Sequence, residues 1–188
     1  MTTEKVNIRF IVLVAFILIA AFSRMIPHPL NFSPLGAIGI FGAAHFSKKW
    51  HALIAPLAAT WLSDLFINNI IYVKYYPEFT WISSGFYWQY GAYVLIVLAG
   101  FIIMKKVNTA TVFTGALASS AIFFLVSNFG CWPGSSYPQN MGGLMECYAA
   151  GVPFLKNTLL SDLFFAGVLF GGFALAQKQV PSLRPAHA

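Results

Sequence analysis

Two aspartates within apolar segments are the residues of this chain best suited to chemistry. Asp64 and Asp162 are each the only acid in an apolar stretch. An ionisable side chain inside a membrane costs about 2.5–3.5 kcal/mol, so each should face the interior of a helix bundle and find a partner there. The functional interpretation is a ligand-facing or gating acid. The structural alternative is an acid that caps or hydrogen-bonds neighbouring helices, and the sequence leaves both open.

The same short pattern surrounds both acids. Residues 60–66 read TWLSDLF and residues 158–164 read TLLSDLF, which differ only at the second position. The two segments run in opposite directions in the topology predicted below. A 3+3 inverted repeat would place them in equivalent positions, and such repeats hold ligand sites at their interface. The match indicates either an inverted repeat or a chance similarity.

Arg24 is the natural partner for these acids because it ends the first apolar segment. Its long side chain could extend to the lipid head groups or reach inward to a carboxylate. His28 lies in a Pro-His-Pro turn, where the following proline favours an extended backbone, and Asn31 follows it. We therefore take Arg24, His28 and Asn31, with Asp64 and Asp162, as candidate ligand-binding residues.

Aromatic residues crowd residues 72–93. An interfacial aromatic belt explains part of this density, and a wall or lid over a flat or apolar ligand is the functional interpretation. We expect Trp81, Trp88 and Trp132 to form a cavity wall above the two aspartates, and we add Asn128 to the candidate ligand-binding residues.

The two cysteines, Cys131 and Cys147, both fall within residues 128–152. The glycines and prolines of this segment predict a folded outer loop rather than a long helix. On the oxidising side of a bacterial membrane, two cysteines in one loop favour a disulfide. A thiolate that ligates a metal-containing ligand is the alternative. Because no CxxC pattern is present, the sequence predicts no metal site.

The composition indicates that the candidate site residues are carried by helices embedded in a membrane. The chain has 188 residues, of which 59% are hydrophobic and 9% are charged, whereas soluble domains carry about 25% charged residues. So few charges require lipid to cover much of the exterior. The sequence therefore predicts an all-α integral membrane protein with a single transmembrane domain over residues 1–188.

Six apolar segments predict one bundle of six transmembrane helices. A spanning helix needs about 20 residues, and the second segment is close to the lower limit. The first segment also resembles the start of a signal peptide, but no small-x-small cleavage site follows it, so we expect it to be retained. The predicted helices lie near residues 9–25, 33–47, 51–71, 86–104, 109–127 and 153–176.

Lysines and arginines predict the orientation, because they concentrate on the cytoplasmic side. With both termini in the cytoplasm, only Arg24, Lys74 and Lys156 face outward. This favours a multi-pass protein of the bacterial inner membrane. The net charge of +6 comes from clusters between apolar runs, which argues against a nucleic-acid partner. The residues predicted to face the cytoplasm are Lys5, Arg9, Lys48, Lys49, Lys105, Lys106, Lys178 and Arg184.

Several enzyme motifs are absent from the sequence. It contains no HExxH, no P-loop, no GxGxxG and no GxSxG elbow. We therefore expect no enzymatic activity and no cofactor.

Three stretches carry a resemblance to a known group of proteins. Residues 24–37 with 41–43, residues 127–130 and residues 153–162 resemble an uncharacterised family of small bacterial membrane proteins. In size, helix count and outer decoration, the chain is also similar to the substrate-binding S subunits of energy-coupling-factor vitamin importers, the cobalamin-binding type among them. That second resemblance implies a vitamin bound between the outer loops and the helix ends, and an ATPase-coupled transmembrane partner.

Two features depart from the S-subunit pattern. Those subunits carry an alanine-x-x-x-alanine docking patch on the first helix, but here Ala15 is followed four positions later by Ile19. The cobalamin-binding type uses a cysteine between the third and fourth helices, and both cysteines of this chain come later. Cobalamin is therefore one ligand among several that the resemblance allows.

The leading functional hypothesis is a membrane transport protein. It would be the subunit of an importer that binds a small, vitamin-like molecule at the outer half of the bundle. The alternative is a structural or assembly subunit of a larger membrane complex. Membrane lipid is a partner in both cases.

Overall fold

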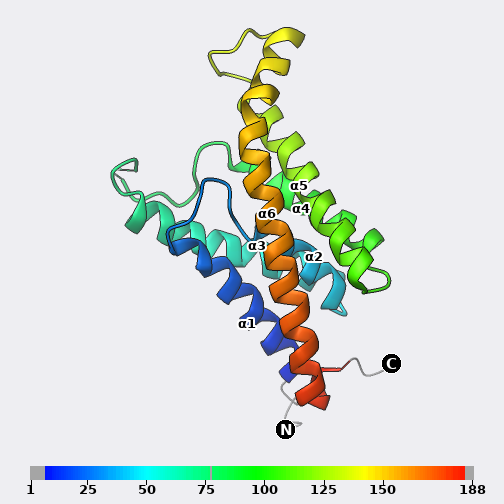
Figure 1. Cartoon of the computed structure of the whole chain (residues 1–188). Coiled ribbons are helices and arrows are strands. Elements are labelled where there is room, and N and C mark those ends of the chain that lie inside the picture. Colours follow the sequence, from blue (N-terminus) through cyan, green and yellow to red (C-terminus); the bar gives the residue numbers. More distant parts are fainter. Residues whose placement is uncertain (1–6, 77, 185–188) are drawn as a thin grey trace.

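The computed structural model describes residues 7–76 and 78–184, and its regular structure is helical (Figure 1). The chain therefore has the all-α fold predicted from its composition. The elements are α1 (Ile8–Phe22), η1 (Ser23–Met25), α2 (Leu35–His45), α3 (Lys49–Phe66), η2 (Ile67–Ile71), α4 (Phe86–Ile103), α5 (Thr109–Cys131), α6 (Met141–Gln179) and η3 (Pro181–Leu183).

Five of the six α-helices, some with a short continuation, are long and apolar enough to cross a membrane. The exception is α2, with 11 residues. At 1.5 Å per residue its length is about 16 Å, roughly half the thickness of the hydrocarbon core. The predicted six spanning helices are thus corrected to five helices of spanning length and one short helix.

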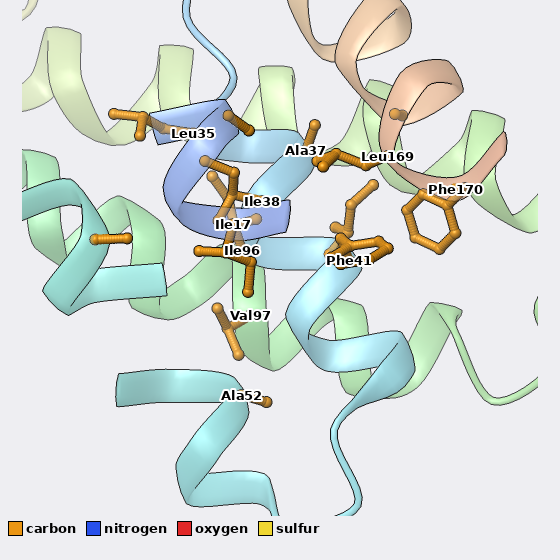
Figure 2. Packing of buried hydrophobic residues seen from close by; sticks show 14 of the residues in the cluster. Ile17, Leu35, Ala37, Ile38, Phe41, Ala52, Ile96, Val97, Leu169 and Phe170 are labelled. Carbon is orange, nitrogen blue, oxygen red and sulfur yellow. The ribbon is translucent and has the colours of Figure 1, made fainter. Parts of the chain in front are cut away.

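This short helix is the centre of the molecule. Every residue from Leu35 to Gly42 is buried, and α2 contacts all five longer helices. A helix that is apolar on all sides has no face for solvent and belongs in an interior. Figure 2 shows Ile38 and Phe41 of α2 packed among side chains of its neighbours, including Ile96 from α4 and Phe170 from α6.

The segment between η1 and α2 re-enters the bundle and is held by α6. Asn157 Nδ2 donates a hydrogen bond to the Leu30 carbonyl at 2.9 Å. Ser161 Oγ donates to the Ser33 carbonyl at 2.7 Å, and the Phe32 ring packs on the rings of two α6 phenylalanines. Because of these contacts, α2 begins beside Ser161, partway along α6. From this level a helix of 11 residues is long enough to reach the end of the bundle where α6 ends.

Helices α5 and α6 are longer than predicted. Residues 128–152 were expected to form a loop, but α5 continues to Cys131 and α6 begins at Met141. Asn140 caps α6, because its Oδ1 accepts a hydrogen bond from the Gly143 N–H at 3.0 Å. Gly151 faces Asn128 so closely that a Cβ would collide with the amide, so this glycine permits helix contact rather than ending the helix.

The 39 residues of α6 span about 58 Å, nearly twice what a membrane crossing needs. The first part of α6, the end of α5 and the turn between them therefore project beyond the other helices, at the top of Figure 1. We call residues 129–152 the hairpin, and the end of the bundle that carries it the hairpin end.

The opposite end brings the beginning of α1 and the end of α6 together. The Arg9 guanidinium, on α1, donates hydrogen bonds to the carbonyls of His45 at 3.0 Å and of Leu183. His45 ends α2, and Leu183 lies in η3, just after α6. We call this the terminal end of the bundle.

Candidate functional site

A cavity of about 230 Å³ lies on the hairpin side of α2. Four residues of the sequence-predicted site line it, namely Arg24, His28, Asn31 and Asp162. We call it the Arg24 cavity. Its other lining residues come from the re-entering segment, from α2, α4, α5 and α6, and from η2 and the residue after it. They are Leu30, Ser33, Leu35, Gly36, Ile67, Tyr72, Gln89, Tyr93, Phe123 and Thr158.

Arg24 pairs with Asp64, one of the two predicted acids. Arg24 Nη1 lies 2.7 Å from Asp64 Oδ1 and 2.9 Å from Ser63 Oγ. Tyr90 Oη donates a hydrogen bond to the other carboxylate oxygen, Oδ2, at 2.9 Å. The Arg24 and Asp64 side chains are 13% and 15% exposed. A part-buried ion pair therefore joins the end of α1 to α3 and α4 beside the cavity.

The guanidinium has donors left over for a ligand. Among the described residues, its side-chain hydrogen bonds both start at Nη1, although arginine carries five N–H donors. Because Arg24 also lines the cavity, its remaining N–H groups can bind an acceptor such as a carboxylate or carbonyl. The pairing with Asp64 thus fixes the position of the Arg24 guanidinium but occupies only some of its N–H donors.

Asp162 occupies a different environment at the deep end of the cavity. The residue is 1% exposed. Ser120 Oγ donates a hydrogen bond to its Oδ2 at 2.7 Å, and the backbone N–H of Ala37 lies close to the carboxylate. A Cβ on Gly36 would collide with both carboxylate oxygens. The acid therefore sits directly on the first turn of α2.

This position makes Asp162 the cap of α2. The N-cap residue of α2 is Pro34, which makes no side-chain capping bond, and the first N–H groups of a helix need acceptors. A carboxylate at that end also interacts favourably with the helix dipole. The structural alternative left open by the sequence, an acid that ties neighbouring helices together, thus describes Asp162 well.

His28 and Asn31 form part of the cavity entrance and are both exposed. The two ring nitrogens of His28 lie 2.9 Å from the Pro29 carbonyl oxygen and 3.1 Å from the Arg24 carbonyl oxygen. Asn31 has a positive φ of 60°, a left-handed conformation that asparagine tolerates better than most residues. These contacts fold the 26–34 segment over the cavity.

Gln89 and Tyr93 line the cavity but were not among the predicted site residues. They lie one turn apart on α4, and Gln89 Nε2 donates a hydrogen bond to Tyr93 Oη at 3.1 Å. The available signal was their spacing of four, which puts two polar groups on one face of a helix. Tyr93 was counted only as one of many aromatic residues.

The predicted tryptophan wall does not form over the cavity. Trp81 is 64% exposed, and its carbonyl accepts a hydrogen bond from the Trp61 indole at 3.1 Å. Trp88 packs against Phe129, with ring centroids 5.3 Å apart, and Trp132 Nε1 donates to the Pro138 carbonyl at 2.9 Å. Trp88 and Trp132 thus pack at the hairpin, and the aromatic lining comes from Tyr72, Tyr93 and Phe123.

A second cavity, of about 420 Å³, adjoins the first between α5 and α6. Asn128 lines this one, and its Nδ2 donates a hydrogen bond to the Phe124 carbonyl at 2.8 Å. We call it the hairpin cavity. Four residues line both cavities, which makes them neighbours along one path: Leu30, Asn31, Phe123 and Thr158.

The cysteines are free in the structure, in contrast to the predicted disulfide. Cys131 is exposed and Cys147 is buried, although both line the hairpin cavity. Cys147 Sγ lies 3.4 Å from the Asn128 carbonyl oxygen and donates to it. The prediction assumed one shared loop, whereas the two residues belong to separate helices whose geometry directs the Cys147 thiol toward α5 backbone. Among the described residues, no group of three or more metal-ligating acids, histidines or cysteines gathers.

Five apolar helices of spanning length surround a buried short helix with a cavity beside it, an all-helical architecture that is compatible with the class of multi-pass membrane proteins. Within that class, the chain belongs to the Family of unknown function (DUF6580), whose model matches residues 4–183. No curated protein and no solved structure shows significant similarity to the chain.

Proposed function

We propose that this protein is a membrane transport protein that binds a small molecule in the Arg24 cavity, as the binding subunit of an importer. The observation that carries the proposal is Arg24 itself. Its guanidinium is fixed by Asp64, lines a cavity and keeps N–H donors for an acceptor. A cation held at a defined position in a largely apolar bundle is expensive to maintain, and this favours a functional use.

The size and chemistry of the cavity suggest the class of ligand. Drug-sized ligands occupy pockets of about 300–1,000 Å³, so a cavity of about 230 Å³ suits a smaller molecule and not one as large as cobalamin. Arginine favours a carboxylate or another planar acceptor. Tyr72, Tyr93 and Phe123 offer flat apolar surface to the remainder. A small vitamin-like carboxylate fits these features.

The hairpin cavity supports a route of entry. It shares Leu30, Asn31, Phe123 and Thr158 with the Arg24 cavity, and Leu30 is exposed at the junction. In this proposal, a ligand passes along the groove between α5 and α6 before it meets Arg24. The cavities are then successive parts of one pathway.

The proposed setting is the bacterial inner membrane, with six segments in the bundle and both termini in the cytoplasm. The distribution of lysine and arginine supports this orientation. The similarity in size and helix count to S subunits supports an ATPase-coupled transmembrane partner. In this orientation the Arg24 cavity opens outward, as a site for import requires.

Mass spectrometry of the purified protein tests the proposal directly. We expect a small acceptor-bearing molecule to co-purify with the wild type and to be lost from Arg24→Gln. Lys156→Gln is the matched control, because Lys156 is an exposed cation of α6 that does not line the cavity. Equal occupancy in Arg24→Gln and the wild type would reject the site, as would a wild-type protein that carries and binds no small molecule.

The projecting hairpin favours a second candidate function, a structural or assembly subunit of a larger membrane complex. Residues 129–152 extend past the other helices (Figure 1), and a projection of this kind suits contact with another protein outside the bilayer. Deletion of residues 133–136, which shortens the turn and removes no residue that lines either cavity, should then disrupt a complex seen by native electrophoresis while leaving ligand binding intact. Loss of ligand with no change in complex size favours the transport proposal instead.

A further inference from the structure

A basic cavity lies at the terminal end of the bundle, on the opposite side of α2 from the Arg24 cavity. Its volume is about 360 Å³. Arg9 from α1, His45 from α2, and Lys48 and His51 from the start of α3 line it. None of its described lining residues is acidic. Four basic side chains from three helices therefore share a cavity without a described acid among them.

Arg9 is fixed in this cavity by contacts that leave its charge uncompensated. Its acceptors in the described chain are backbone carbonyls, those of His45 and Leu183, and its guanidinium lies 5.5 Å from the centroid of the Phe173 ring. Neutral acceptors orient a cation but do not cancel its charge. The positive potential is thus available to a ligand.

His45 adds a buried ring nitrogen that has no hydrogen-bond partner among the described residues. Its ring packs on the rings of Phe41 and Phe173, with centroids 4.7 Å apart in both cases. Its Nε2 is buried, and no described residue hydrogen-bonds to it. A buried polar atom without a partner carries a free-energy cost, which a ligand that accepts or donates at Nε2 would remove.

The beginning of α3 also provides groups that can bind an anion. Lys48 is the N-cap of α3 and provides no side-chain capping bond. The His51 N–H donates to the Lys48 carbonyl at 3.0 Å, but the N–H groups of Lys49 and Trp50 have no acceptor among the described residues, and the positive end of the helix dipole lies at the cavity. His51 is held beside Lys48 by the rings of Trp50 and Phe10, with centroids 3.7 and 4.7 Å away. Backbone donors and basic side chains together are the arrangement that binds phosphate groups.

We propose that this cavity binds the phosphate of an anionic phospholipid. The apolar surface beside the cavity favours a lipid over a free anion: Ile8 and Ile11 on α1 and Trp50 and Ile54 on α3 are large hydrophobic side chains about half exposed. Acyl chains can cover these side chains while the phosphate occupies the cavity. Basic pockets between helix ends are known sites for anionic head groups. The inference is independent of the transport proposal.

Native mass spectrometry of the full chain with phosphatidylglycerol tests this site. Lys48→Gln should weaken retention of the lipid about fivefold, as expected for one cation near a membrane surface, and Lys48→Gln with His51→Gln should weaken it further. Lys49→Gln is the matched control, because the Lys49 ammonium lies over the Phe101 ring at 5.7 Å and does not line the cavity. We expect Lys49→Gln to retain lipid like the wild type.

Three results would overturn the inference. The first is equal loss of lipid in Lys48→Gln and Lys49→Gln, which would indicate non-specific surface charge. The second is retention of phosphatidylcholine as strong as that of phosphatidylglycerol. The third is full displacement of the lipid by millimolar glycerol phosphate or inorganic phosphate, which would assign the cavity to a soluble anion. Unfolding of a variant is monitored by its circular dichroism, and Lys48 is exposed, so a folded protein is expected.

Discussion

The two TxLSDLF segments of α3 and α6 share a pattern but use their acids differently. In both, the threonine hydroxyl donates to the carbonyl four residues earlier, at 2.8 Å for Thr60 and 3.2 Å for Thr158. The two serines that precede the acids are fully buried. The acids then diverge: one meets a cation, and the other meets only neutral donors among the described residues.

The difference comes from the helix end that faces each acid. Asp64 meets the end of α1, where Arg24 supplies a positive charge. Asp162 lies at the beginning of α2, close to the backbone N–H of Ala37, and accepts a hydrogen bond from the hydroxyl of Ser120 on α5. The same residues at the same spacing therefore give an ion pair beside a cavity in one place and a helix cap in the other. A motif specifies that a partner is needed, but the neighbouring element decides which partner it is.

The largest effect is expected when the cap is removed. Asp162→Ala removes the carboxylate that faces the first turn of α2, whereas the Ser120 hydroxyl keeps a second acceptor, the Ala116 carbonyl at 3.2 Å. The helix end left without its acceptor should lower the free energy of unfolding by about 2–3 kcal/mol. Asp162→Asn keeps an acceptor and should lose less. Titration with a denaturing detergent measures both. If Asp162→Ala unfolds like the wild type, Asp162 is not the cap of α2.

A double-mutant cycle isolates the contact between the cap and Gly36. Gly36→Ala alone should destabilise the protein, because the new Cβ collides with the Asp162 carboxylate. In the Asp162→Ala background the same change should cost less, since the colliding atoms are gone. Additive losses in the cycle would show that the two positions act independently.

A smaller loss of stability is expected at the ion pair. Asp64→Asn keeps hydrogen bonding to Arg24 but removes the charge. Because the pair is part-buried, the loss should lie between those of exposed and buried pairs, at about 1–2 kcal/mol. If the transport proposal holds, ligand uptake should fall even under conditions in which the variant stays folded, because Arg24 loses its fixed position. The exposed acid Glu146 supplies the control, Glu146→Gln. Wild-type uptake in Asp64→Asn would leave Asp64 with a structural role and favour the assembly function.

The smallest effect is expected from Tyr90→Phe. This change removes one hydrogen bond to Asp64 and leaves the Arg24 pair in place, so the free energy of unfolding should fall by about 0.5 kcal/mol. The same detergent titration measures it. A loss as large as that of Asp162→Ala would mean that Tyr90, rather than Arg24, is the main partner of Asp64.

Much of the fold could be predicted from composition and apolar periodicity, because these report burial directly. The helical class and the approximate positions of six segments follow from them. The shortness of α2 was visible as a segment near the lower limit, but its central burial was not, because burial on all sides depends on the helices around it. The hairpin was missed because the glycines and prolines of residues 128–152 favoured a loop. Gly143 and Gly151 instead lie within α6, where they allow close contacts with Pro138, in the turn before α6, and with Asn128 of α5.

The candidate site could be predicted in part. The pairing of Arg24 with Asp64 was foreseen from the cost of a charge in an apolar segment. The positions of Trp81, Trp88 and Trp132 were not, because aromatic content says nothing about the direction of a side chain. The 3+3 inverted repeat remains a prediction: the two TxLSDLF segments agree with it, whereas its second elements, α2 with 11 residues and α5 with 23, differ in length.

The length of α6 has a mechanical consequence. This helix runs from the projecting hairpin, past Asp162 at the start of α2, to the terminal end where Arg9 holds Leu183. Pro153 lies inside it, between the hairpin and Asp162, and a proline in a helix interior removes one backbone hydrogen bond and favours bending at that point. We therefore expect a force on the hairpin to be taken up as bending at Pro153, while the part of α6 that follows stays fixed against the bundle.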